Sequence, residues 1–168
     1  MLDNFQPDLA FGKKAEAIVL ETFSALTTDY TFEDISSIRG FFYCGDIKAT
    51  DKNGKVKYIE VKNDSRIADT KNVLCEFEVY YKDNEYYGKG NMDSNCDVFC
   101  VVSEQEQKIY VIDFKTLKAN YTKGQYKEIE HKKQTTYCYL CELWQVKKWG
   151  ALIAEVEYSG LHEARVAA

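Results

Sequence analysis

Histidine is scarce in this chain, which contains only His131 and His162 among its 168 residues. The first lies in a lysine-rich segment and the second near the C-terminal end, so the sequence offers no convincing catalytic triad or histidine-based site. No apolar run reaches about 18 residues, the length that a membrane-spanning helix needs. Residues 1–8 contain two acids and no basic run, unlike an export signal. We therefore expect a soluble, cytoplasmic protein with no membrane partner.

Internal repeats, low-complexity tracts and evident linkers are also absent from the sequence. With 45% apolar and 29% charged residues, a chain of this length is the size of one globular domain and can bury a sizeable core. The sequence thus predicts a single domain over residues 1–168.

An excess of positive charge is missing as well. The net charge is -5, whereas nucleic-acid binding needs Lys and Arg near the phosphates. Residues 1–114 hold 13 Lys and Arg against 21 Asp and Glu, and residues 115–149 hold 8 against 3. This division is expected if carboxylates bind a cation while a separate basic stripe binds phosphate, and ordinary solvated faces explain it equally well. The candidate phosphate-binding residues are Lys115, Lys118, Lys123, Lys127, Lys132 and Lys133.

The six cysteines lie mostly among apolar and aromatic neighbours. In a cytoplasmic chain this favours reduced, buried thiols over disulfides. Two pairs, Cys96 with Cys100 and Cys138 with Cys141, have spacings that would suit zinc thiolates. Neither pair shows the polar turn of a zinc knuckle, so small core residues are the favoured interpretation.

Hydrophobic spacing predicts one long helix over about residues 9–27, with Asp8 as its N-cap. A segment rich in polar residues and lysine follows at residues 122–136. The order of elements indicates an α+β fold in which helices pack on an antiparallel or mixed β-sheet. Extended segments or strands are predicted at 32–37, 41–49, 56–62, 73–81, 97–102, 108–114 and 136–143, and short helices at 115–121 and 144–150.

The turn signal at residues 51–55 joins two of these strands in a hairpin, and its register decides whether Asp46 and Glu60 can meet. A two-residue Asn-Gly turn would place Asp46 on the opposite face, because side chains alternate along a strand. A three-residue loop, with Gly54 in the left-handed conformation, would instead pair Asp46 with Glu60 and bring Lys62 to the same face. Both loops are compatible with the sequence.

Two adjacent carboxylates repel one another unless a cation lies between them. Mg²⁺ prefers oxygen ligands, so Asp46, Glu60 and the Val61 carbonyl are the expected ligands, with Mn²⁺ as a substitute. Lys62 would orient or deprotonate the attacking water, or stabilise the negative charge that develops on the phosphorus oxygens. The reaction that this arrangement predicts is phosphodiester hydrolysis. Charged residues are also common on exposed hairpin faces, so the spacing alone is weak evidence.

The residues Gly-Asp at positions 45–46, followed by Ile-Glu-Val-Lys-Asn-Asp at 59–64, resemble the signature of the PD-(D/E)XK nuclease superfamily. Residues 60–62 form its E-x-K half, and Gly45 stands where the signature has proline. The literal Pro7-Asp8 pair precedes the first helix and lies outside the pattern. The resemblance covers roughly residues 9–114 and implies a restriction-endonuclease-like core, a central mixed β-sheet flanked by helices.

The same resemblance extends to Glu16, which is similar to the first-helix glutamate that contributes to the metal site in resolvase-like, phage and restriction-type members. An exposed Glu16 without a role is the alternative interpretation. Two looser matches select Glu76 and Asp97, for which polar residues at strand ends or hairpins are the simpler interpretation.

The resemblance implies a Mg²⁺-dependent DNA endonuclease with Asp46, Glu60, Lys62 and Glu16 in its active site. A homodimer is expected, because each such site cuts one strand. A non-enzymatic alternative stays open: the chain could keep the fold and bind nucleic acid or a protein partner. The tyrosines at 80–81 and 86–87 would either stack on bases or pack in the core or an interface.

Overall fold

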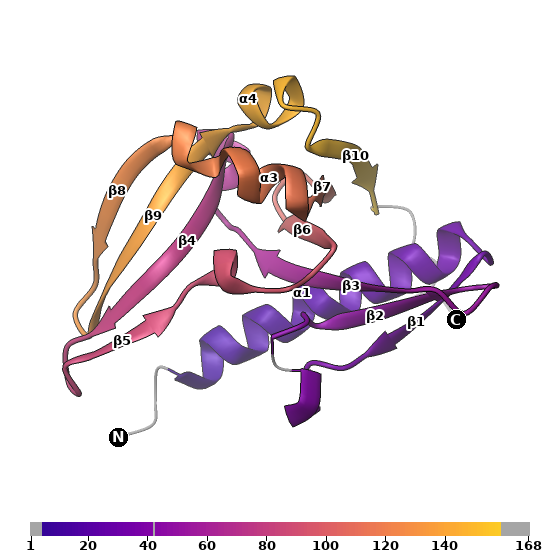
Figure 1. Cartoon of the computed structure of the whole chain (residues 1–168), viewed down its shortest axis with the longest axis horizontal. Helices are drawn as coiled ribbons and strands as arrows, with labels where there is room; N and C mark the ends of the chain where they lie inside the picture. Colours follow the sequence, from indigo (N-terminus) through magenta and orange to yellow (C-terminus); the bar gives the residue numbers. More distant parts are fainter. Residues whose placement is uncertain (1–4, 42, 159–168) are drawn as a thin grey trace.

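The computed structural model describes residues 5–41 and 43–158, and within α1 it describes side chains from residue 10 onward. The described residues form two β-sheets with helices packed against them (Figure 1). The main sheet has the strand order β1 (Tyr30–Asp34), β2 (Ile47–Asp51), β3 (Val56–Asn63), β6 (Val98–Ser103), β7 (Lys108–Asp113) and β10 (Leu152–Glu157).

The second sheet is antiparallel throughout. Its strand order is β5 (Tyr86–Lys89), β4 (Asn72–Tyr81), β9 (Gln134–Glu142) and β8 (Gln125–Glu130). The helices are α1 (Phe5–Leu26), α2 (Ile67–Thr70), α3 (Phe114–Asn120) and α4 (Leu143–Lys148), with 3-10 turns η1 (Arg39–Phe41), η2 (Asn91–Asp93) and η3 (Tyr121–Lys123). No described helix is long and apolar enough to cross a membrane.

A mixed central sheet flanked by helices is therefore confirmed. Strands β3 and β6 pair in parallel, and the other neighbours in the main sheet are antiparallel. The connection between β3 and β6 carries α2, β4, β5 and η2. Two strands of the second sheet, β4 and β5, therefore follow directly after β3, the strand that holds the predicted E-x-K residues, whereas β8 and β9 come later in the chain.

Strand β6 shows how the two faces of the main sheet are covered. Its side chains alternate, so Cys100 and Val102 pack toward α1 while Phe99 and Val101 pack toward α3 and the second sheet. All four are buried to within 1% of complete. The main sheet thus lies between α1 on one face and α3 with the second sheet on the other.

Helix α1 begins earlier than the sequence predicts. Asp8 was expected as the N-cap, but it lies inside a helix that starts at Phe5. That prediction was wrong because Pro7 falls in the first turn, where its missing N–H has no helical partner to lose. The predicted apolar face is correct, since Ala15, Ile18 and Val19 are buried against the main sheet.

The β2–β3 hairpin closes through the three-residue loop. Asp51 N donates to Lys55 O at 2.9 Å, Gly54 has φ +81°, and Thr50 pairs with Val56. The register that sets Asp46 against Glu60 is therefore confirmed. The strand predicted over residues 41–49 is shorter than expected, because residues 39–41 form η1 and β2 begins only at Ile47; Phe42 lies outside the described residues.

Three strands lie where the sequence predicted none. Strand β8 falls in the polar segment expected as a loop, and its side chains are almost all exposed. An edge strand needs no buried apolar face, so β8 has little hydrophobic signal. Strand β5 is only four residues long, and β10 begins four residues after α4 ends. The three strands are stabilised by pairing, β5 with β4, β8 with β9 and β10 with β7, and local sequence patterns do not predict such pairing.

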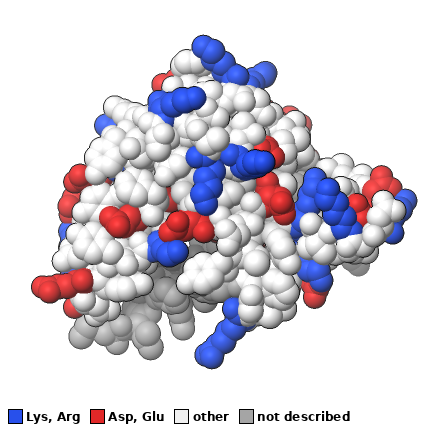
Figure 2. Space-filling view, in the orientation of Figure 1, with Lys and Arg blue, Asp and Glu red and all other residues white. Residues whose placement is uncertain are grey.

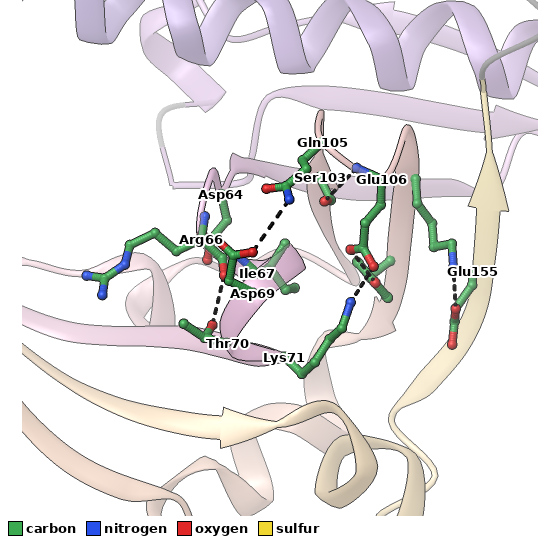
Figure 3. A network of polar contacts seen from close by, with 12 residues as sticks. Asp64, Arg66, Ile67, Asp69, Thr70, Lys71, Ser103, Gln105, Glu106 and Glu155 are labelled. Atoms are coloured by element: carbon green, nitrogen blue, oxygen red, sulfur yellow. Dashed lines mark hydrogen bonds and ion pairs between the residues drawn. The ribbon is translucent and has the colours of Figure 1, made fainter.

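A polar network fixes the place where the chain leaves the main sheet for the second (Figure 3). The Asp64 carboxylate accepts from the backbone N–H groups of Arg66 and Ile67 at 2.8 and 3.1 Å, which starts α2. Lys71, just before β4, forms an ion pair with Glu106 on the β6–β7 turn. Strand β4 is thereby tied to the same hairpin that pairs with β3.

The cysteines in the described chain are all free thiols, and five of the six are buried. Cys100 lies in the main sheet and Cys138 with Cys141 in the second. Cys141 lies close to Cys75, with 3.8 Å between the sulfurs. Among the described residues no group of three or more His, Cys, Asp or Glu could hold a metal ion, so the cysteine pairs form no zinc site there.

Candidate active site

A cleft of about 440 Å³ opens between the β2–β3 hairpin and the second sheet. Asp46, Glu60 and Lys62 all line it, as the register of the hairpin requires. Its remaining walls come from the β1–β2 connection, from η2 and the residues beside it, and from β4, β5 and β9. They include Ser36, Tyr43, Gly45, Glu76, Val79, Tyr81, Lys89, Gly90, Asn91, Asp93, Ser94, Gln134 and Thr136.

Asp46 lies immediately before β2 and bends toward β3. Its backbone N–H donates to Ile59 O at 2.8 Å, and its Oδ2 accepts from Val61 N at 2.8 Å. The carboxylate is therefore fixed to the backbone of the strand that carries Glu60 and Lys62. This bond uses the N–H of Val61; the predicted role of the Val61 carbonyl as a metal ligand stays a prediction.

Gly45 makes this approach of the two chain segments sterically feasible. It has φ +129°, and a Cβ added there would lie 2.6 Å from Ile59 O. Only glycine occupies such a conformation without strain. Proline has φ fixed near −65° and would not fit. The departure from proline in the sequence pattern thus has a local steric cause.

Replacing Gly45 by alanine should therefore destabilise the fold and displace Asp46. We expect a loss of about 1–3 kcal/mol in the free energy of unfolding, from the strained φ and the contact with Ile59 O. Urea unfolding measures this loss. Gly40→Ala is the matched control, because a Cβ at Gly40 meets nothing within 4 Å. Equal stability of the two variants would contradict the steric account.

The two carboxylates of the site are partly buried and close enough to interact. Burial raises the pKa of Asp46 to about 6, although the Val61 N–H lowers it in part. Burial and then the Asp46 charge raise the pKa of Glu60 to about 7. Ser94 Oγ donates to Glu60 Oε2 at 3.2 Å and partly offsets this increase. Near neutral pH the pair therefore holds negative charge that a cation would stabilise.

Glu16 projects from α1 toward the same pair. Its side chain is only 14% exposed and forms an ion pair with Lys13, with 2.7 Å between Nζ and Oε2. Its charge contributes to the raised pKa values of Asp46 and Glu60. The alternative of an exposed Glu16 is thus wrong. Glu16 does not itself line the cleft, so a direct catalytic role stays a prediction.

Lys62 meets an acid that the sequence analysis ranked below the main candidates. Lys62 Nζ lies 3.2 Å from Glu76 Oε2, and the Glu76 side chain is 18% exposed. The ion pair joins β3 of the main sheet to β4 of the second. Glu76 is therefore part of the candidate site, whereas the simpler interpretation had made it an ordinary strand-end residue.

A β-bulge directs Glu76 into the cleft. The β4–β9 register shifts between Glu76 and Glu78. Asn91 stabilises the distorted strand, because its side chain accepts from Glu76 N at 2.9 Å and donates to Leu74 O at 3.3 Å. Gly90 has to be small, since a Cβ there would lie 2.2 Å from Glu76 O. Sequence reasoning missed Asn91; a Gly-Asn pair after a strand indicates only a turn.

Asp97, the other loose match, has a structural role. It is exposed, its Oδ2 accepts from Tyr58 N at 2.8 Å, and its own N–H donates to Tyr58 O at 2.8 Å. These bonds extend the parallel pairing of β3 with β6 by one residue. The interpretation of Asp97 as a polar strand-end residue is confirmed.

The six predicted phosphate-binding lysines are exposed and spread over α3, η3, β8 and the β8–β9 turn. None of them lines the described cleft. Lys118 comes nearest, since its Nζ donates to Ser94 O at 3.5 Å. On the face in Figure 2, Lys and Arg side chains lie in separate groups among uncharged surface. Phosphate binding by this segment stays a prediction.

The chain resembles a known protein in its fold and not in its sequence. No protein-family model matches the sequence, and no curated protein matches it significantly. One similar solved structure is a bacterial homing endonuclease, 12% identical, which matches over 76% of this chain and 75% of that one with a TM-score of 0.48. At that level the likeness carries no argument about activity, and membership of the PD-(D/E)XK superfamily stays a prediction.

Proposed function

We propose that this chain is a Mg²⁺-dependent endonuclease that hydrolyses phosphodiester bonds of DNA. The observation that carries the proposal is the convergence of Asp46, Glu60 and Lys62 in one cleft, through a hairpin register that the sequence left open. Two interacting, partly buried carboxylates beside a lysine are the groups that metal-assisted phosphodiester hydrolysis uses.

The donor set suits Mg²⁺. Asp46 and Glu60 supply carboxylate oxygens, and the Val61 carbonyl is a third candidate ligand. The raised pKa values of the two carboxylates show that their charged forms are disfavoured, which a divalent cation would relieve. Mg²⁺ commonly binds one or two carboxylates, several waters and substrate phosphate oxygens, so a cluster of three acidic side chains is not required. When bound, the ion would supply Lewis-acid polarisation of the scissile phosphate, and Mn²⁺ should substitute for it.

Lys62 provides the positive charge that the protein itself places in the site. Its ammonium can orient the attacking water or stabilise the charge that develops on the phosphate oxygens. Glu76 holds this flexible side chain in one direction, and Asn91 holds Glu76 in turn. The chain therefore fixes its lysine before substrate binds, which electrostatic stabilisation of a transition state requires.

A cleavage assay tests the proposed function. Purified protein is incubated with single-stranded, duplex, flap and junction DNA in Mg²⁺ or Mn²⁺, with EDTA as the metal-free control. We expect metal-dependent cleavage of at least one form, and cleavage about 10²–10³ times slower with Lys62→Ala. If the wild-type protein cuts nothing above the Lys62→Ala background, the nuclease proposal fails.

Analytical ultracentrifugation of the same sample tests the homodimer that we propose for cutting two strands.

Glu76→Gln should slow cleavage without weakening DNA binding. The amide has the same shape but no charge, so it loses the ion pair that directs Lys62. We expect kcat to fall about tenfold or more with KM unchanged, because Glu76 is proposed to act through Lys62 in the transition state. The matched control is Glu78→Gln on the same strand, which does not line the cleft. A KM effect alone would contradict this role.

One observation favours the alternative, a nucleic-acid- or protein-binding module without activity. The described residues contain no group of three acidic, cysteine or histidine side chains that could hold a metal. On that alternative Mg²⁺ would change neither stability nor DNA binding. Isothermal titration of the protein with Mn²⁺ separates the two, since the nuclease proposal needs a site that Asp46→Asn removes.

A further inference from the structure

The cleft continues well beyond the acidic pair. From Glu76 it follows β4 to Tyr81, five residues on, which corresponds to about 16 Å at roughly 3.3 Å per residue. Tyr81 and Val79 from β4, with Gln134 and Thr136 from β9, line this far end of the cleft. A single strand stacked at about 3.4 Å per nucleotide would place roughly five nucleotides along that length.

Contacts with β5 hold the Tyr81 ring in one position at the far end of the cleft. It lies across Gly88 on β5, where an added Cβ would approach its Cε2 to 2.9 Å. It also stacks on Tyr86, with 6.3 Å between ring centroids and 22° between the planes. The side chain is nevertheless 40% exposed and lines the cleft. The ring is therefore held on one side and available on the other.

The chemistry of this end suits an unpaired base. Tyr81 offers an aromatic ring and Val79, which is 7% exposed, an apolar surface. Gln134 brings a partly exposed amide, which can pair with the polar edge of a base, and Thr136, which is 4% exposed, lies beside it in the wall of the cleft. Stacking on an aromatic ring together with edge hydrogen bonds is how proteins bind single-stranded nucleic acid.

The charges of the cleft offer few phosphate contacts to either form of DNA, and only an unpaired strand can add contacts to its bases. Its acidic lining residues, Asp46, Glu60, Glu76 and Asp93, outnumber its lysines, Lys62 and Lys89. A duplex keeps its bases inside and presents phosphates, so it binds mainly through rows of Lys and Arg. Lys and Arg form no continuous patch on the face in Figure 2. Stacking would therefore have to supply much of the binding energy.

We propose that the far end of the cleft, around Tyr81, is a subsite for an unpaired nucleobase, and that single-stranded DNA is the substrate. The substrate assignment rests on the proposed nuclease function, whereas the subsite itself predicts binding with or without cleavage. The strand runs from Tyr81 along β4, and its phosphate near Lys62 is the one exposed to hydrolysis.

Fluorescence anisotropy in EDTA tests the subsite apart from catalysis. The probe is a short labelled DNA oligonucleotide without self-complementarity, and the competitor is the same sequence as a duplex. Tyr81→Leu should weaken binding of the single strand by about fivefold or more, the loss expected for one base–aromatic stack. Tyr81→Phe, which keeps the ring, should bind like the wild type. The matched control is Tyr87→Leu, since Tyr87 is exposed but pairs with Tyr80 and does not line the cleft.

The outcomes separate the two proposals. Tight single-strand binding that depends on Tyr81, without cleavage in Mg²⁺, would support the subsite and contradict the nuclease function. Cleavage of a duplex at a rate that Tyr81→Leu leaves unchanged would support the nuclease function and contradict the subsite. Equal weakening by Tyr81→Leu and Tyr87→Leu, or stronger binding of the duplex, also overturns it. Thermal unfolding of each variant shows that any loss of binding occurs in folded protein.

Discussion

Replacing Asp46 by asparagine is expected to abolish Mg²⁺-dependent cleavage and to stabilise the metal-free protein above pH 7. Asparagine keeps the shape of the side chain and can still accept from Val61 N, so the hairpin should be preserved. It removes the charge that raises the pKa of Glu60 and that we propose binds the cation. Asp46→Asn should therefore lose activity but gain stability, as expected where a functional site lowers the stability of the fold.

The stability gain follows from the raised pKa of Asp46. An Asp has a pKa near 4 in an unfolded chain, whereas burial raises the pKa of Asp46 to about 6 in the folded protein. Between these values the folded state binds more protons, so stability falls as pH rises through this window. The shift corresponds to roughly 3 kcal/mol as an upper figure, so we expect Asp46→Asn to be about 1–3 kcal/mol more stable at pH 8. Near pH 4 the two proteins should be equally stable.

Urea unfolding in EDTA at pH 4.5 and pH 8 measures this difference. Adding Mg²⁺ at pH 8 should stabilise the wild type and leave Asp46→Asn unchanged, because a ligand stabilises only the state that binds it. A matched control is Asp51→Asn in the β2–β3 turn, whose carboxylate accepts from backbone N–H groups and lies outside the cleft. A destabilised Asp46→Asn at pH 8 would show that the carboxylate is not electrostatically strained.

Replacing Lys62 by alanine should lower the cleavage rate by about 10²–10³ while leaving the metal site intact. A preorganised cation at the developing charge contributes on that order to catalysis. Binding of Mn²⁺ should persist, since Asp46 and Glu60 keep their oxygens. The variant also leaves Glu76 without its cationic partner, so part of the decrease in cleavage rate comes from the unpaired Glu76 charge in the cleft.

Lys55→Ala provides the control for Lys62→Ala. Lys55 is exposed in the loop of the same hairpin and does not line the cleft. Single-turnover cleavage of labelled DNA compares the two at saturating metal. A Lys62→Ala enzyme that cleaves at the wild-type rate would contradict the catalytic role of Lys62. An equal decrease in the cleavage rate of Lys55→Ala would indicate a general effect on the hairpin.

The hairpin was the part of the site that the sequence could predict. Its two strands alternate well, and Gly54 marks the left-handed residue that a three-residue loop needs. From that loop the positions of Asp46, Glu60 and Lys62 follow by counting. The helix that carries Glu16 was predictable too, because its apolar face repeats at helical spacing.

The second half of the site depends on contacts that local patterns do not encode. Glu76 meets Lys62 from a different sheet, beside a bulge in β4 that is hydrogen-bonded to Asn91, and Asn91 is distant in sequence from both strands' local patterns. Ser94 reaches Glu60 through η2 and the loop that follows it. The edge strand β8 was missed since exposed strands lack the hydrophobic alternation by which strands are detected. Tertiary pairing, and not propensity, determined these elements.

The central claim is that Asp46 and Glu60 together bind the divalent cation of a nuclease. A crystal soaked in Mn²⁺ and recorded at a wavelength where manganese scatters anomalously tests it most directly. The account predicts one anomalous peak between the carboxylates of Asp46 and Glu60, within coordination distance of both. An ordered site with no peak there, and with the two side chains directed apart, would contradict it.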